Sequence, residues 1–177
     1  MAMFLNLAFL LILLTPVYSS AQLDNDSSTP EEVVQKFCQL DADGMRLRGD
    51  TWRQSILPLV TWVEEAGDVI FIIDRFKVGK AKVNGDKATV PVDYVTIGST
   101  NFIQFSNPSP KWLNPYPYQL VKKKGVWKID GPISAPHVHF KIAIDSLRTL
   151  QKAESARKAA LEAIIQQINN AKKQLHK

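Results

Sequence analysis

The chain has 177 residues, of which 45% are hydrophobic and one is a cysteine. That length suits one domain with its own core, and the lone Cys38 excludes an internal disulfide and a cysteine-rich zinc site. The formal net charge is +5. Residues 22–140 balance 14 Lys/Arg against 14 Asp/Glu, and residues 141–177 carry 8 against 3, so the whole excess lies in the last segment. A neutral body with a basic tail argues against a nucleic-acid enzyme, whose basic face is part of the fold.

The first 21 residues have the pattern of a signal peptide. Met3–Leu14 is almost entirely apolar, Pro16 then breaks the helix, and Ser19–Ala21 supplies the small residues that a signal peptidase reads. Residues 22–28 are polar and read as a flexible lead-in. We therefore expect the mature protein outside the cytosol, secreted or periplasmic. The alternative is an uncleaved N-terminal segment that anchors the chain in a membrane.

Helical signals open the mature chain. Thr29 can cap a helix, Pro30 suits its first position, and Glu32 completes a capping box. The helix is expected to run to Gly49, with an apolar stripe that includes Val33, Phe37, Leu40 and Leu47. A short second helix is expected over residues 51–57, where Pro58 interrupts it.

The middle of the chain changes to strand patterns. Residues 69–83 and 87–99 read as two strands joined by an Asn84-Gly85 turn, and Pro91 indicates an edge position or a bulge. A long loop over 100–115 precedes a second hairpin, residues 116–123 and 126–130, which turns at Lys124-Gly125. Helices followed by antiparallel strands with short turns predict an α+β fold.

Two segments resemble the nuclear transport factor 2-like superfamily, also called ketosteroid isomerase-like or SnoaL-like. They are Val78–Tyr94, VGKAKVNGDKATVPVDY, and Tyr118–Asp130, YQLVKKKGVWKID. The resemblance implies a cone fold over residues 29–137, with N-terminal helices packed in a curved antiparallel sheet (a cone-shaped barrel). Members of that superfamily include isomerases, dehydratases, cyclases, small-ligand binders and non-catalytic dimerisation domains, so the fold alone selects no activity.

Enzymes of this superfamily do acid–base chemistry with a carboxylate or histidine in the cavity, and the resemblance makes Asp43 and Asp93 the catalytic candidates. A helix residue and a strand residue could converge on one cavity. The observation that separates an enzyme from a binding domain is the interior of the cone. If the side chains of Phe37, Trp52 and Tyr94 fill it, no room remains for a substrate.

Aromatic residues are the candidates for binding a small apolar ligand. They are Trp52, Tyr94, Phe102, Phe105 and Trp112. His137 and His139 follow two prolines in an expected loop, and no third ligand stands near them, so neither a metal nor another cofactor is expected.

Residues 138–177 read as one long, basic, amphipathic helix after the domain, free of glycine and proline. Leu161, Ile164, Ile168 and Leu175 form a seam at coiled-coil spacing, which is typical of a homodimer or of docking to a protein partner. Glu154 and Arg157 interrupt the apolar stripe. On this interpretation, deleting Leu161–Lys177 leaves the core folded and changes the oligomeric state.

The sequence thus predicts an exported, non-catalytic domain that binds a small apolar ligand or a protein partner. The alternative is a cavity-carboxylate enzyme of the ketosteroid isomerase or SnoaL type. A structural component of the cell envelope is a third interpretation.

Overall fold

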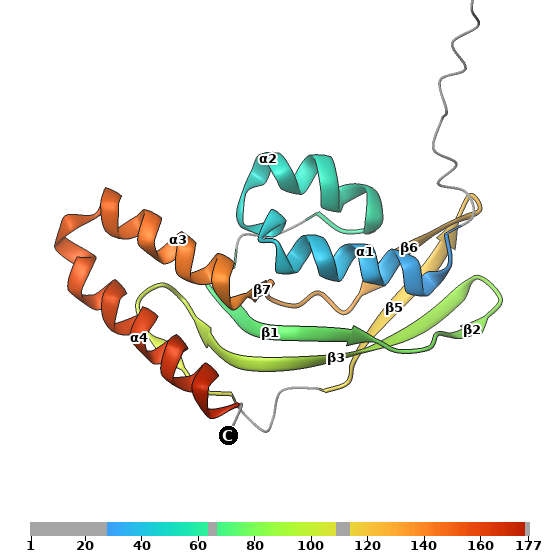
Figure 1. Cartoon of the computed structure of the whole chain (residues 1–177). Coiled ribbons are helices and arrows are strands. Elements are labelled where there is room, and N and C mark those ends of the chain that lie inside the picture. The colour runs from blue at the N-terminus through green and yellow to red at the C-terminus, as the bar shows by residue number, and fades with distance from the viewer. Residues whose placement is uncertain (1–27, 64–66, 109–113, 176–177) are drawn as a thin grey trace, which may run out of the picture.

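The computed structural model describes residues 28–63, 67–108 and 114–175. Within these residues the chain forms an α+β fold built on one curved sheet (Figure 1). The sheet forms the centre of the fold, with α1 on one face and the C-terminal helices on the other. This differs from the expected arrangement, in which the sheet wraps around the N-terminal helices. The expected signal peptide, nearly all of the lead-in and Trp112 lie outside the described residues.

Helix α1 (Pro30–Ala42) begins as the sequence predicts. The Thr29 hydroxyl accepts a hydrogen bond from the Glu32 amide at 3.3 Å, and the Glu32 carboxylate accepts one from the Thr29 amide at 2.7 Å. The helix ends before the expected Gly49, because Gly44 adopts a left-handed conformation with φ of 77°. Glycine adopts that conformation without the steric cost that other residues incur, so the chain turns there.

Short helical turns follow α1 and pack against α1 and β6. They are a 3-10 turn at Met45–Leu47, α2 (Gly49–Thr51), a π-helical turn at Trp52–Ile56 and a 3-10 turn at Leu57–Leu59. Trp52 and Ile56 are buried, and the expected short second helix over residues 51–57 lies within this run.

The strands pair in the spatial order β6-β5-β3-β1-β7, and β2 and β4 also pair with β3. Their bounds are β1 (Ile70–Val78), β2 (Lys82–Asn84), β3 (Lys87–Thr100), β4 (Phe105–Ser106), β5 (Tyr116–Lys123), β6 (Val126–Gly131) and β7 (His137–His139). The β1–β7 pair is parallel, so the sheet is mixed where an antiparallel one was expected. The two histidines therefore lie on a strand, whereas the sequence interpretation placed them in a loop.

Of the two hairpin turns, the first lies one residue later than expected and the second lies where expected. Asn84 pairs with Lys87, so the central turn residues are Gly85 and Asp86, one position later than the sequence indicated. Gly85 has the positive φ of 58° that this turn needs. The second turn lies at Lys124-Gly125 as expected, with φ values of 52° and 86°.

Pro91 lies in the central strand β3, whereas an edge position or a bulge was expected. Proline has no N–H to donate to a neighbouring strand, and it is tolerated here because β1 ends at Val78, near Pro91. The Gly79 amide, between β1 and β2, donates to the Pro91 carbonyl at 2.7 Å. A Cβ at Gly79 would stand 2.8 Å from the Pro91 ring, so the close approach requires glycine.

Two hydrophobic clusters lie on opposite faces of the sheet. Ile72 and Ile73 are neighbours in β1 and both are fully buried, but they belong to different clusters because successive strand residues point to opposite faces. Ile73 packs with α1 and the aromatic interior, whereas Ile72 packs with the C-terminal helices. The sheet therefore supports two separate cores.

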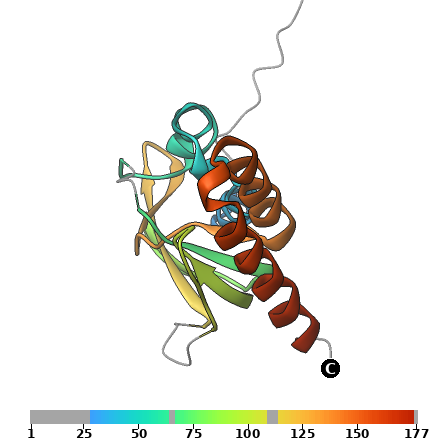
Figure 2. The ribbon, with the colours of Figure 1, turned by 90° about the vertical axis from the view of Figure 1, so that its left-hand side faces the viewer.

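The C-terminal segment is a helical hairpin, and this corrects the expected single helix. Helix α3 (Phe140–Ala153) and α4 (Lys158–Gln174) are joined by a 3-10 turn at Ser155–Arg157 and lie side by side (Figure 2). The break coincides with Glu154 and Arg157, the positions that interrupt the apolar stripe, and these two side chains form an ion pair at 2.8 Å.

The expected docking seam faces the protein's own core. Leu161, Ile164 and Ile168 are at most 2% exposed and pack against α3 and the sheet, so in this structure they are not available to a partner. Leu175 alone of the four is exposed, at 43%. In the described parts of the chain, every helix is too short or too polar to cross a bilayer.

Candidate functional site

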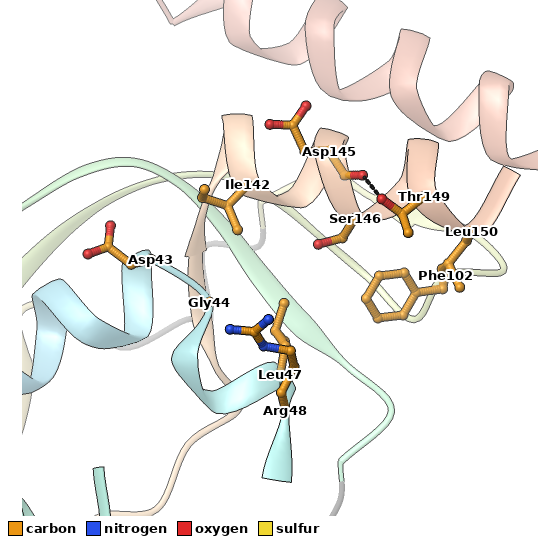
Figure 3. Close-up of a pocket in the computed structure, with 10 residues that line it drawn as sticks. All are labelled: Asp43, Gly44, Leu47, Arg48, Phe102, Ile142, Asp145, Ser146, Thr149 and Leu150. Carbon is orange, nitrogen blue, oxygen red and sulfur yellow. Dashed lines mark hydrogen bonds between the residues drawn. The ribbon is translucent and has the colours of Figure 1, made fainter. Parts of the chain in front are cut away.

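A groove of about 680 Å³ opens between the turn after α1, helix α3 and the loop between β3 and β4 (Figure 3). Its lining combines apolar with polar side chains: Asp43, Leu47, Arg48, Phe102, Ile142, Asp145, Ser146, Thr149 and Leu150, together with Gly44. Pockets of this volume typically hold small organic molecules.

The first wall of the groove is the turn after α1, which lies very close to α3. A Cβ added at Gly44 would stand 2.9 Å from Cγ2 of Ile142, so glycine is required by contact as well as by its positive φ. Leu47 and Arg48 continue this wall (Figure 3). The contact between Gly44 and Ile142 thus sets the distance between the turn and α3 on this side of the groove.

A buried ion pair fixes this wall from behind. Arg46 lies between the groove residues Gly44 and Leu47, but its side chain points inward. Its Nη1 lies 3.3 Å from Asp41 Oδ2, with side chains 1% and 0% exposed, and its Nη2 donates to the Ser134 carbonyl at 2.7 Å. The turn is therefore attached both to α1 and to the segment before β7.

Asp41 also attaches α1 to strand β7. Its Oδ2 accepts a hydrogen bond from the backbone amide of His137 at 2.9 Å, and it lies 3.8 Å from His137 Nδ1. The second distance is too long for a hydrogen bond. Burial, together with the positive charge of Arg46, lowers the pKa of His137 to about 3, so the imidazole is neutral and serves as a flat, stacked ring.

Aromatic rings enclose that imidazole. Tyr94 stacks on His137 with centroids 4.0 Å apart and planes 12° apart, and Phe71 stacks with centroids 5.0 Å apart. The Tyr94 hydroxyl lies 2.8 Å from the Tyr118 hydroxyl and 3.2 Å from the Cys38 sulfur. Burial raises the pKa of Cys38 to about 12 and that of both tyrosines well above 10, so these groups remain neutral. They form a packed polar core with no reactive nucleophile.

The third side of the groove is a constrained loop that presents Phe102. This residue has a φ of 62°, which is unusual and costly for a bulky side chain. Hydrogen bonds hold it: its amide donates to the Thr100 hydroxyl at 3.0 Å, and its carbonyl accepts from Arg157. The Asn101 side chain accepts from the two amides that follow. The loop thus fixes the Phe102 ring at the groove.

The charged groups of the lining differ in their partners. Asp145 pairs with Arg148 at 3.6 Å, and both oxygens of Asp43 accept hydrogen bonds from the Gln39 amide. The Arg48 guanidinium, in contrast, has no ion-pair partner among the described residues. The lining therefore carries one guanidinium without an ion-pair partner, together with the two carboxylates of Asp43 and Asp145.

Of the expected site residues that the structure describes, only Asp43 and Phe102 line the groove. Asp93 is exposed on the face of β3 opposite to the buried Tyr94, so it does not converge with Asp43 on a cavity. Trp52 and Tyr94 are buried in the core, and Phe105 packs on Gly98, whose added Cβ would meet its ring at 2.4 Å. These three are packing residues.

Asp43 also lines a second pocket, of about 410 Å³, on the other side of the end of α1. His139 and Arg75 lie in the same pocket, with Phe76. His139 Nδ1 accepts from the Lys141 amide at 3.4 Å and caps α3. Partial burial lowers the pKa of His139. In the part of the chain that the structure describes, no three His, Cys, Asp or Glu side chains gather as metal ligands.

Sequence reasoning missed the buried group that shapes the site. Asp41, Arg46 and His137 come from three separate segments, and only the fold brings them together. One signal was present: Asp41 falls on the same helical face as Cys38 and Phe37, an unusual place for a carboxylate unless it is paired inside. Comparison with protein-family models, curated proteins and solved structures found no match to this chain.

Proposed function

We propose that this protein is a non-catalytic binding domain that holds a small apolar ligand in the groove beside Phe102. The observation that carries the proposal is the strained, fully anchored loop that places the Phe102 ring at the edge of a groove of about 680 Å³. Strained backbone persists where the surrounding structure enforces it, and it is concentrated at binding sites.

The chemistry of the lining favours a ligand with an apolar body and an anionic head, of the size of a medium-chain fatty acid. Leu47, Ile142 and Leu150 supply the apolar contacts together with Phe102, and Arg48 supplies a cation that has no ion-pair partner among the described residues. Arginine binds carboxylates through paired hydrogen bonds. The head group would therefore lie at Arg48.

The alternative function, a cavity-carboxylate enzyme, has less support. Phe37, Trp52 and Tyr94 are 1%, 7% and 6% exposed and belong to one cluster, which is the filled interior that argues against a substrate there. The interior carboxylate Asp41 is engaged by Arg46 and by the His137 amide. A group held in this way serves packing better than proton transfer.

Kinship with the nuclear transport factor 2-like superfamily and export from the cytosol are part of the same proposal. The kinship is supported by the capped opening helix, the Gly85-Asp86 hairpin and the buried Trp127 that follows the second turn. Export is supported by the N-terminal sequence pattern.

Thermal shift with saturated fatty acids of increasing chain length tests the proposal. A ligand present far above its Kd raises the melting temperature in proportion to the logarithm of its concentration. We expect a fatty acid to stabilise the wild type and to lose this effect in Phe102→Ala. In the wild type the acid should bind more tightly than the alcohol of the same chain length, and Arg48→Gln should remove that difference. Ile103→Ala is the matched control, because Ile103 is 71% exposed in the same loop and does not line the groove. Equal binding by the Phe102 and Ile103 variants would refute the proposal.

A further inference from the structure

The two hairpin turns gather lysines at one end of the sheet. Lys87 of β3 lies opposite Val121 of β5, and the Lys122 amide donates to the Asp86 carbonyl at 2.8 Å, so the two turns are neighbours. The exposed lysines at this end are Lys80, Lys82, Lys87, Lys122, Lys123 and Lys124. These lysines belong to residues 22–140, whose total charge is zero, so the charge count alone does not reveal this basic surface.

The positive charge at this end is compensated only in part. Among the described residues, none of these lysines forms an ion pair with a carboxylate. Asp86 is exposed in the turn, and Glu31 accepts a hydrogen bond from the Ala81 amide at 2.8 Å. Glu32 lines a pocket with Val126 and Trp127 just after the second turn, so three acidic groups lie at this end. The Lys122 ammonium lies 5.7 Å from the centre of the Trp127 ring. The net charge of this end remains strongly positive.

An exposed apolar side chain lies within the basic end. Val83, in β2 between Lys82 and Asn84, is 56% exposed. Val83 projects to the face of the sheet that carries Ala88 and Lys122, whereas Lys82 and Lys87 project to the opposite face. The basic end therefore presents lysines on both faces and an apolar side chain on one, a combination found on surfaces that rest on an anionic bilayer.

The N-terminal chain enters the fold at the same end. Glu31, in the first turn of α1, contacts Ala81 beside β2, and Ser28 lines a pocket with Val126 and Trp127 just after the second turn. Figure 1 shows the start of α1 beside these hairpins. Met3–Leu14, the apolar stretch, ends fourteen residues before Ser28; an extended chain of that length reaches about 50 Å. In the alternative in which the N-terminal segment stays uncleaved in a membrane, that membrane would lie within reach of the lysines.

We propose that the end of the sheet formed by the two hairpin turns docks on the surface of an anionic lipid bilayer. The lysine ammonium groups lie against lipid phosphates, and Val83 contacts the interface between head groups and acyl chains. This surface is separate from the groove beside Phe102, and the proposal is independent of the ligand.

Co-sedimentation of the mature chain, residues 22–177, with vesicles tests the proposal, because the apolar Met3–Leu14 would bind any bilayer. We expect binding to phosphatidylglycerol/phosphatidylcholine vesicles to exceed binding to phosphatidylcholine vesicles, and added salt to reduce the difference. Lys82→Gln, Lys87→Gln and Lys123→Gln combined should lower the partition coefficient on anionic vesicles by about 100-fold, since each lysine near such a surface contributes roughly fivefold.

A variant of equal charge change is the control. Lys141→Gln, Lys152→Gln and Lys158→Gln combined alters exposed lysines of the C-terminal hairpin, at the other end of the molecule. It should bind anionic vesicles as the wild type does. Equal losses in the two triple variants would show a response to net charge alone and overturn the proposal. Equal binding to neutral and anionic vesicles, or retention of anionic binding by the first variant, would also overturn it.

Discussion

Asp41 and His137 lie 96 positions apart, and the carboxylate of one accepts a hydrogen bond from the backbone amide of the other at 2.9 Å. The contact joins the first helix to the last strand. Because Arg46 binds the same carboxylate oxygen, the turn that forms one wall of the groove is attached to the same point. The geometry of a surface groove is thus determined by a buried polar group that does not line it.

Replacing Arg46 tests this dependence. Arg46→Met leaves the buried Asp41 carboxylate without its guanidinium, and breaking a buried pair in this way costs about 3–5 kcal/mol of unfolding free energy. Adding Asp41→Asn should recover part of the loss, because the remaining charge is removed. Urea denaturation of the two single variants and the double variant measures the coupling.

The exposed pair between Arg148 and Asp145, with side chains 61% and 69% exposed, is the control. Arg148→Met should change stability by less than about 1 kcal/mol. Similar losses for Arg46→Met and Arg148→Met would contradict the role given to the buried pair.

The stability of the protein should decrease as pH falls through the range in which His137 titrates in the unfolded chain. The folded pKa of about 3 lies below the ordinary 6.5, so between these values the unfolded chain binds more protons. Stability from this group is therefore complete above about pH 6.5 and is lost at up to about 1.4 kcal/mol per pH unit below it. His137→Phe keeps a stacked ring and removes the titration.

Urea denaturation at several pH values from neutral to acid measures the difference between His137→Phe and the wild type. The variant should lose stability with a shallower slope, while Asp41 and Arg46, which face the ring, contribute equally to both proteins. Parallel slopes would show that His137 has the same pKa in the folded and unfolded states, contrary to the lowered value.

The sequence predicted local features well and distant contacts poorly. The capping box at Thr29, the turn at Lys124-Gly125 and the strand pairs follow from short patterns, and the structure has them. The turn lies one residue later than expected, because glycine also suits the first central position of a two-residue turn and the pairing of Asn84 with Lys87 selects that register. Asp41, Arg46 and His137 meet only through the fold, so no local pattern could reveal them.

The C-terminal helices show the same limit. The spacing of Leu161, Ile164 and Ile168 identified an apolar face, and that face is buried. Periodicity does not say what covers a face, however, and here the protein's own sheet covers it. The turn at Ser155–Arg157 reverses the chain, so that α4 lies beside α3 instead of continuing it as one long helix.

Substituting Gly44 should destabilise the fold and disturb the groove. Gly44→Ala places a Cβ 2.9 Å from Ile142 at a φ of 77°, and the left-handed conformation alone costs about 1–2 kcal/mol for a non-glycine residue. We expect a loss of at least that size in urea denaturation. Gly49→Ala is the control, because a Cβ there has no neighbour within 4 Å, and it should not destabilise the protein. A Gly44 variant as stable as the Gly49 variant would show that the turn adjusts freely.

Removing Leu161–Lys177 should unfold or aggregate the domain, contrary to what the sequence pattern alone indicated. The deletion uncovers Ile70, Ile72 and Ile97, which are at most 2% exposed and share a cluster with α4, and such an apolar surface is an aggregation hazard. A milder test is Ile168→Ala, which should cost about 2–5 kcal/mol because the side chain is fully buried. Leu175→Ala, at 43% exposure, should cost much less. A soluble, cooperatively unfolding deletion variant would show that the sheet folds without the hairpin, and that α4 is free to serve a partner.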